Sequence, residues 1–249
     1  MSRAMDVAGR RIWVVGASSG IGAALARELC RRGAHVAISA RRADALQAVA
    51  GEWMTAVPCD ITDADDVRQA ADVVAAELGG IDIAVLSAGY WKQMGSDFDV
   101  ESINQHLKVN VGGMANCLGE LIPRMNVQGA GVIVGISSVA GYRGLPGSEA
   151  YGASKAAQIN LLEALRVRLR PDGIDVITVC PGFVKTEMTE QNTFPMPFMV
   201  SAEQAGRAIA DGIEKQSARI VFPWQMSLLM RVAKLVPDRL WAIALTPRS

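Results

Sequence analysis

Short apolar runs and longer amphipathic stretches alternate along most of the chain. The runs have the length of buried strands, and the stretches repeat apolar residues at helical spacing. The pattern predicts strands at residues 12–15, 35–39, 54–59, 81–86, 132–136 and 175–179. It predicts helices at residues 21–32, 43–50, 63–78 and 151–169. Because strands and helices alternate, we expect an α/β fold with one doubly wound parallel sheet and helices on both faces.

Composition and charge are those of a globular domain. The chain has 249 residues, of which 50% are hydrophobic and 20% are charged. These values predict a single domain over residues 1–249 and exclude an intrinsically disordered chain. The 25 basic and 25 acidic residues cancel. A net charge of zero argues against a broad nucleic-acid-binding surface.

The four cysteines, Cys30, Cys59, Cys117 and Cys180, lie far apart in the sequence. Zinc sites and thioredoxin-like motifs need closer spacing, so we expect no metal site and buried, reduced thiols. No secretory signal is recognisable, and no run of 18 uncharged apolar residues predicts a membrane-spanning helix. Since reduced thiols are typical of the cytosol, we expect a cytoplasmic protein.

A glycine-rich turn joins the first predicted strand to the first predicted helix. It reads GASSGIG and contains Gly16, Ser18, Ser19, Gly20, Ile21 and Gly22. Glycines allow the backbone to approach phosphate groups, and a helix N-terminus presents free N–H groups and a positive dipole end. The turn is therefore a candidate pyrophosphate-binding loop, although its GxxxGxG spacing differs from the GxGxxG fingerprint of dinucleotide sites.

Three polar residues form a candidate acid–base site. Tyr151 and Lys155 are four positions apart on a predicted helix, so their side chains share one face. An ammonium group beside a phenol favours the phenolate, which is expected to lower the pKa of Tyr151. Ser138 follows a predicted strand 13 positions before Tyr151, where its hydroxyl can meet a substrate oxygen.

The order of these motifs resembles that of the short-chain dehydrogenase/reductase family. From about Arg11 to Thr189 the sequence contains GASSGIG, CDIT, SAG, KVN, SSVAG, YGASK and PGFVKT, at spacings similar to those of the family. The resemblance implies a Rossmann fold and an NAD(P)-dependent oxidoreductase that acts on CH–OH groups.

The resemblance also implies a catalytic tetrad of Asn110, Ser138, Tyr151 and Lys155. Tyr151 would exchange a proton with the substrate oxygen, and Ser138 would hold that oxygen. Lys155 would bind the nicotinamide ribose and lower the pKa of Tyr151. Asn110 would position a water molecule in a proton relay.

Further residues match the cofactor contacts of the family. They are Asp60 and Ile61 at the adenine, Ser87, Ala88 and Gly89 beside the cofactor, and Pro181, Gly182, Val184 and Thr186 in the segment that binds the carboxamide. The sequence departs from the family at Val15, where threonine is usual, and at Ser87, where asparagine is usual. Neither position belongs to the tetrad, so we expect activity to be retained.

Charge after the second predicted strand favours NADP(H) over NAD(H). An acidic residue there would bind the ribose 2′-hydroxyl, but this chain has Ala40 followed by Arg41 and Arg42. A guanidinium group can bind a phosphate through two hydrogen bonds. Arg41 directly follows the discriminating position and is the first candidate, with Ser18 as a further hydroxyl. The alternative is that both arginines belong to a solvated turn.

Residues 187–223 are expected to form a substrate lid and the segment that follows it. The lid sequence EMTEQNTFPMPFMVS is apolar and contains two prolines. Apolar residues in the lid and near the expected site are Phe194, Met196, Phe198, Met199, Tyr90, Trp91, Met94 and Leu145. They favour a hydrophobic ketone or alcohol over a sugar, with ordinary core packing as the alternative.

Residues 224–245 form an apolar tail that Arg231, Lys234 and Arg239 interrupt. These charges argue against a membrane span but suit an amphipathic surface helix. Packing or subunit contact is the favoured explanation, and peripheral membrane contact is the alternative. The resemblance implies a homodimer or homotetramer.

The leading hypothesis is an NADP(H)-dependent oxidoreductase that interconverts a ketone or aldehyde with an alcohol. The alternatives are a non-catalytic NADP(H)-binding sensor and a membrane-surface-associated reductase of a lipid-like substrate. A sensor could lose Tyr151 or Lys155, whereas this chain retains both. The enzyme is therefore favoured, and His35 and His106 are expected to be structural.

Overall fold

The computed structural model describes residues 5–95, 97–190, 192 and 194–246. One parallel sheet of seven strands has the order β3-β2-β1-β4-β5-β6-β9. Its strands are β1 (Arg11–Val15), β2 (His35–Ser39), β3 (Thr55–Ala56), β4 (Ile83–Leu86), β5 (Gly131–Ile136), β6 (Ile174–Pro181) and β9 (Arg219–Phe222). A second, two-stranded sheet pairs β7 (Val184–Lys185) with β8 (Val200–Ser201).

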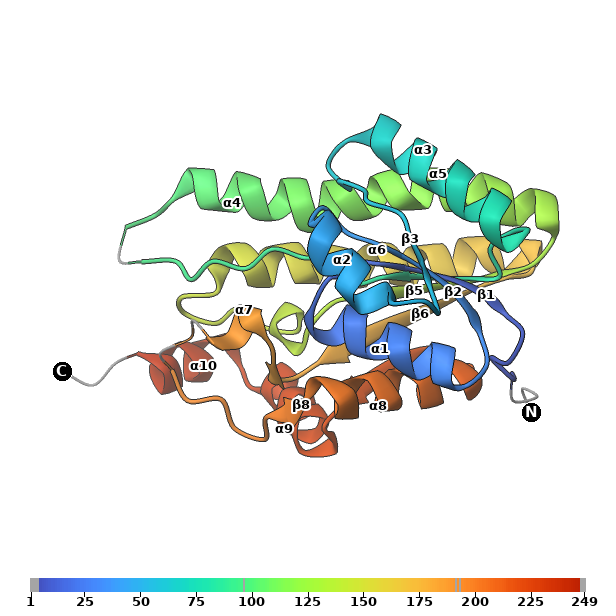
Figure 1. Ribbon diagram of the computed structural model, residues 1–249. Helices are drawn as coiled ribbons and strands as arrows, with labels where there is room; N and C mark the ends of the chain where they lie inside the picture. The colour runs from blue at the N-terminus through green and yellow to red at the C-terminus, as the bar shows by residue number, and fades with distance from the viewer. Residues whose placement is uncertain (1–4, 96, 191, 193, 247–249) are drawn as a thin grey trace.

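Helices cover both faces of the large sheet (Figure 1). One face carries α1 (Gly20–Arg31), α2 (Ala43–Ala50) and α8 (Ala202–Glu214), and the other carries α3 (Ala64–Leu78), α5 (Gly113–Gln128) and α6 (Glu149–Leu169). The remaining helical segments are α4 (Val100–His106), the π-helical η1 (Leu107–Gly112), the short η2 (Val139–Gly141) and η3 (Arg170–Asp172), α7 (Glu187–Glu190), α9 (Trp224–Leu235) and α10 (Asp238–Leu245). The predicted doubly wound Rossmann architecture in a single domain is confirmed.

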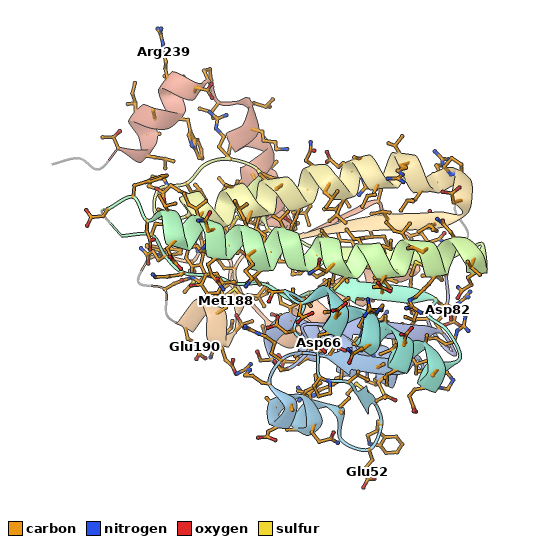
Figure 2. The ribbon with its side chains drawn as sticks, turned by 90° about the horizontal axis from the view of Figure 1, so that it is seen from above. Glu52, Asp66, Asp82, Met188, Glu190 and Arg239 are labelled. Carbon is orange, nitrogen blue, oxygen red and sulfur yellow. The ribbon has the colours of Figure 1, made fainter. Side chains whose placement is uncertain are left out.

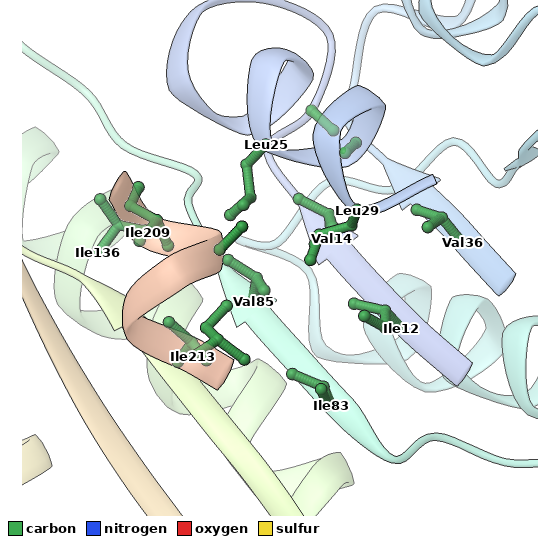
Figure 3. Close-up of a cluster of buried hydrophobic side chains, with 14 of the residues drawn as sticks. Ile12, Val14, Leu25, Leu29, Val36, Ile83, Val85, Ile136, Ile209 and Ile213 are labelled. Atoms are coloured by element: carbon green, nitrogen blue, oxygen red, sulfur yellow. The ribbon is translucent and has the colours of Figure 1, made fainter. Parts of the chain in front are cut away.

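Alternate residues of β1 enter two hydrophobic cores, one on each face of the sheet. Val14 lies on one side, in a core that also contains Leu25 of α1 and Ile209 of α8 (Figure 3). Trp13 is fully buried on the other side, in the core that also contains Leu121 of α5. Burial on both faces explains why the strand reads as a continuous apolar run.

Several elements differ from the sequence prediction. The strand expected at 54–59 is reduced to β3, where Pro58 lies just beyond the strand and has no N–H group for a ladder. The pattern did not predict β9, α8 or the helices between residues 100 and 128. Strand β9 is only four residues long, and its apolar run has three residues between Arg219 and Pro223, which is too short to predict a strand.

The carboxyl ends of the parallel strands meet at one edge of the sheet. The chain leaves β1 at Gly16, β2 at Ala40 and β4 at Ser87. The strand order reverses between β1 and β4. Ligands of doubly wound sheets bind at this edge, next to the reversal, so the fold places the glycine-rich turn where a dinucleotide is expected.

The C-terminal helices are anchored to the loop that follows η2. Trp241 Nε1 donates a hydrogen bond of 2.9 Å to the Gly144 carbonyl, and Arg143 forms an ion pair of 2.9 Å with Asp238. Arg239 projects away from the molecule (Figure 2). The side of α9 that faces solvent forms an outer apolar stripe of Trp224, Leu228, Leu229, Val232 and Leu235. Within the described part of the chain, no helix has the length and apolar character needed to cross a membrane.

Candidate active site

A cleft of about 540 Å³ opens at the carboxyl edge of the sheet. Every residue that the sequence predicted as a cofactor contact lines it, and so do Ser138, Tyr151 and Lys155. Asn110 is the exception, because it is only 1% exposed and lies behind the cleft wall. The cleft lining also contains residues that the sequence analysis did not single out as contacts, namely Cys59, Thr62, Val109, Ile136 and Ser137. Glu187, Met188 and Thr189, at the start of the segment predicted as a lid, line it as well.

The glycine-rich turn has the geometry of a phosphate-binding loop. Gly16 has a φ of +87°, and a Cβ atom there would overlap the backbone of Ala88. A Cβ atom on Gly22 would overlap the Gly16 carbonyl. Helix α1 starts at Gly20, and the Ser19 side chain forms no cap hydrogen bond to its first turn. Backbone N–H groups at the positive end of the helix are therefore available to an anion, which fits the pyrophosphate of a dinucleotide.

Helix α6 presents Tyr151 and Lys155 to the cleft, as their spacing predicted. Lys155 Nζ lies 5.5 Å from the centre of the Tyr151 ring. Ser138 follows β5 and caps η2, where its hydroxyl accepts a hydrogen bond of 3.1 Å from the Ala140 N–H group. The three side chains reach the cleft from two elements, α6 and the end of β5.

Burial controls the protonation of the two titratable groups. It raises the pKa of Tyr151 to about 12, against the lowering effect of a hydrogen bond with Ser138. Burial also lowers the pKa of Lys155 to about 8, because the ammonium group loses solvation. The prediction that Lys155 lowers the pKa of Tyr151 is therefore wrong for the chain without a bound cofactor. The desolvation of the phenol outweighs the hydrogen bond with Ser138, which is the group that lowers the pKa.

Asn110 lies in η1 and its side chain is bonded within the protein. Its Nδ2 donates to Ser154 Oγ at 2.9 Å and to the Tyr90 carbonyl at 3.1 Å, and its Oδ1 accepts from Tyr90 N at 2.7 Å. Asn110 thus fixes the loop that follows β4. Its backbone carbonyl accepts a hydrogen bond of 2.6 Å from Gln158, a fully buried residue that the sequence analysis did not single out.

The two arginines after β2 differ in their contacts. Arg42 Nη2 donates to Ser19 Oγ at 3.0 Å, to Ser18 Oγ at 3.3 Å and to Glu187 Oε2 at 3.0 Å. Arg41 also lines the cleft. Burial opposes a lowering of the Asp60 pKa, but the hydrogen bonds from Thr62, helped by the charge of Arg41, lower it. Arg42 therefore joins the glycine-rich turn to the start of α7.

Aromatic side chains form one wall near Tyr151. The Trp91 ring lies 5.0 Å from the Tyr151 ring, and Trp91 Nε1 donates to Asn192 Oδ1 at 2.9 Å. His106 is buried, accepts a hydrogen bond from Lys92 N and has a pKa lowered mainly by burial, so it is a neutral, structural residue, as predicted.

The other apolar residues expected near the site lie elsewhere. Met94 is buried, and Leu145 lines a separate groove against α10. The lid residues Phe194, Met196, Phe198 and Met199 are not part of the cleft lining. The predicted apolar pocket is corrected to a wall formed by Tyr90 and Trp91, with Met188 from α7.

Comparisons with known proteins agree with this geometry. The profile of the short chain dehydrogenase family matches residues 10–195. An uncharacterised oxidoreductase of Myxococcus xanthus is 39% identical over 242 residues, which cover 94% of this chain and 96% of the relative. A cis-4-hydroxycyclohexanecarboxylate dehydrogenase of Sinomonas cyclohexanicum is 35% identical over 201 residues, or 78% and 79% of the two chains. The crystal structure of a short-chain type dehydrogenase/reductase from Mycobacterium marinum has a TM-score of 0.79 at 32% identity, covering 87% of this chain and 95% of that one.

Proposed function

Because the chain belongs to the short-chain dehydrogenase family and is therefore an NAD(P)-dependent oxidoreductase, we propose that it interconverts a ketone or aldehyde with the corresponding alcohol, using NADP(H). One observation carries the proposal. Tyr151 and Ser138 line the same cleft as the glycine-rich turn. A substrate oxygen bound there lies close to a proton donor and to the place where a dinucleotide fits.

Tyr151 acts as the general acid when the carbonyl is reduced. Since its pKa is raised by burial, the phenol is protonated at neutral pH and can give its proton to the substrate oxygen. Ser138 holds that oxygen through its hydroxyl. Lys155 supplies a positive charge beside the phenol that stabilises the phenolate left behind. When bound, the nicotinamide supplies or accepts the hydride, and the protein contributes orientation and electrostatics.

The charge of the cleft supports NADP(H) as the preferred cofactor. Arg41 and Arg42 line it, and no acidic residue occupies the position of Ala40. Arg42 lies within hydrogen-bond distance of Ser18, the hydroxyl that the sequence assigned to the same phosphate. A 2′-phosphate between these groups would compete with Glu187 for the Arg42 guanidinium.

An apolar substrate is supported by the wall beside Tyr151. Tyr90 and Trp91 offer ring surface with few fixed polar groups, which favours a hydrophobic ketone over a sugar. The Sinomonas relative is named for a substrate with a hydroxyl group and a carboxylate on a hydrocarbon ring, and its hydroxyl group agrees with a secondary alcohol or its ketone.

The outer apolar stripe of α9 supports association with a second copy of the chain. Large apolar surfaces that are exposed on a subunit usually mark a contact site. Peripheral membrane contact, and with it a lipid-like substrate, is the alternative. All four cysteines are free, which fits the reducing cytoplasm that we propose as its compartment.

A screen of NADPH consumption over ketones and aldehydes graded by size and polarity tests the function. We expect turnover with apolar cyclic or aromatic carbonyl compounds and faster reaction with NADPH than with NADH. NADPH binding without turnover on any compound in the panel would favour the sensor instead. Faster reaction with NADH would contradict only the cofactor preference.

A further inference from the structure

A buried glutamine connects two members of the candidate tetrad. Gln158 lies on α6 one turn after Lys155, and it is 0% exposed. Its Oε1 accepts a hydrogen bond of 2.9 Å from Lys155 Nζ. Its Nε2 donates a hydrogen bond of 2.6 Å to the backbone carbonyl of Asn110. One carboxamide thus bridges the lysine of α6 and the asparagine of η1.

The bridge leaves Lys155 in a defined position. Lys155 Nζ donates a second hydrogen bond, of 3.1 Å, to the carbonyl of Ile136 at the end of β5. Lys155 is 3% exposed, so these two acceptors replace much of the hydration that its ammonium group loses. Two acceptors from different elements fix the Nζ atom on the side of the cleft where Gly89 passes.

A carboxamide in this place has a different effect from a water molecule. Water can accept a proton on one side and release another on the other side, whereas an amide has a fixed donor and a fixed acceptor. Gln158 can therefore orient Lys155 without carrying protons between Lys155 and Asn110. Both polar atoms of the Gln158 carboxamide are engaged, since Oε1 accepts from Lys155 and Nε2 donates to Asn110.

We propose that Gln158 is a positioning residue of the active site, and that its carboxamide, rather than a water molecule, links Lys155 to Asn110. The proposal rests on the proposed function, because it assigns a purpose to the position of Lys155. It replaces the relay water that the family resemblance assigned to Asn110 with a fixed contact between side chain and backbone.

The surroundings of Lys155 make its charge sensitive to this contact. The titratable groups that face Lys155 are Tyr151 on α6, His106 on α4 and Cys180 on β6. Burial raises the pKa of Tyr151 and of Cys180 and lowers that of His106, so all three are neutral near pH 8. Lys155 is then the member of this group that titrates near pH 8. Removing an acceptor of its charged form lowers its pKa further.

The direct test is the titration of Lys155 by NMR in protein with ¹³C-labelled lysine and no cofactor. The chain has six lysines, so a Lys155→Ala sample identifies the resonance. In Gln158→Leu and Gln158→Met, two apolar changes of similar volume, we expect the midpoint to fall by about one pH unit or more. In the matched control Gln128→Leu, which alters an exposed amide on α5, it should not move.

A kinetic measurement separates this inference from the proposed function. In NADPH-dependent reduction, the high-pH limb of kcat should move down with the Lys155 midpoint, while KM for the carbonyl compound stays within about twofold. An unchanged midpoint in a folded Gln158 variant would overturn the inference, whether or not the wild type is active. A shifted midpoint in a chain without turnover would retain the inference and refute the proposed function.

Discussion

Burial determines the protonation states of Tyr151 and Lys155 in the candidate site. Tyr151 keeps its proton and Lys155 remains mostly charged at pH 7, since their pKa values are about 12 and about 8. A protonated phenol beside a cation is ready to donate a proton, and this state favours carbonyl reduction. The spacing of Tyr151 and Lys155 predicted their shared face, but it could not predict how strongly each would be desolvated.

Replacing Arg42 by alanine tests the preference for NADPH over NADH. The binding free energy of NADPH should weaken by about 1.5–3 kcal/mol, the range for a hydrogen bond to a charged group. The loss for NADH, which has no 2′-phosphate, should be much smaller. Fluorescence titration of both cofactors measures the difference. Arg41→Ala, the first candidate from the sequence, is expected to act in the same direction.

Arg68→Ala is the matched control for the arginine variants, because Arg68 lies on α3 and pairs only with the exposed Asp65 among the described ion pairs. It should leave both affinities unchanged. Equal losses for NADPH and NADH in Arg42→Ala would contradict the assignment of Arg42 to the 2′-phosphate.

Helices α1 and α8, which pack on the same face of the sheet, also contact each other directly. A Cβ atom on Gly206 of α8 would lie 2.9 Å from the backbone of Ala24, so glycine allows α8 to contact α1 directly. At the end of the same pair, Arg32 binds Glu28, Asp211 and Glu214. These ion pairs connect the first and the eighth helix behind the glycine-rich turn.

Glu28→Gln is expected to reduce stability by about 1.5–3 kcal/mol at pH 7, because it weakens charge-assisted hydrogen bonds to Arg31 and Arg32. These arginines lower the pKa of Glu28 to about 2. A carboxylate with a lowered pKa stabilises the fold above its unfolded pKa of about 4.3, and this effect is lost as the pH falls toward 2.

Urea denaturation between pH 7 and pH 2 provides the measurement for Glu28→Gln. The difference in unfolding free energy between wild type and variant should shrink below about pH 4.3. A difference that is constant over this range would show that the Glu28 charge is not its source.

The sequence predicted those elements whose pattern is strong. The strands that became β1, β2, β5 and β6 are apolar runs, and α6 is a long helix whose Tyr151 and Lys155 are at helical spacing. Helix α5 contains Pro123, and η1 and α5 meet at Gly112 and Gly113, so this region lacked a clear pattern. The bridge by Gln158 could not be predicted either. Helical spacing predicts which face of α6 carries Gln158, but its partner Asn110 lies 48 residues away in the sequence.

In the whole molecule, the residues of the candidate site lie together at one edge of the sheet. Motifs spread from Gly16 to Thr186 line a single cleft because parallel strands end together. Away from the cleft, the outer apolar stripe of α9 is exposed and has no partner within the described chain. A second copy of the chain is the occupant that we expect.

A triple change of Trp224, Leu228 and Val232 to serine tests this contact. Size-exclusion chromatography with light scattering should give a smaller species than for the wild type, since the change removes apolar interface area. Trp53→Ser is the control, because Trp53 is also a large exposed apolar residue but lies after α2. Unchanged mass in the triple variant, together with pelleting of the wild type on anionic vesicles, would assign the stripe to a membrane surface.

The central claim is that Tyr151 transfers the proton that accompanies hydride transfer. Tyr151→Phe keeps the ring against Trp91 and removes only the phenolic oxygen, so fold and NADPH affinity should be retained. Stopped-flow measurement of hydride transfer, on protein shown to be folded by circular dichroism, is the most direct test. We predict a rate at least about 100-fold lower than that of the wild type, as general acid–base catalysis usually contributes 10²–10⁴-fold. A rate close to that of the wild type would show that another group carries the proton.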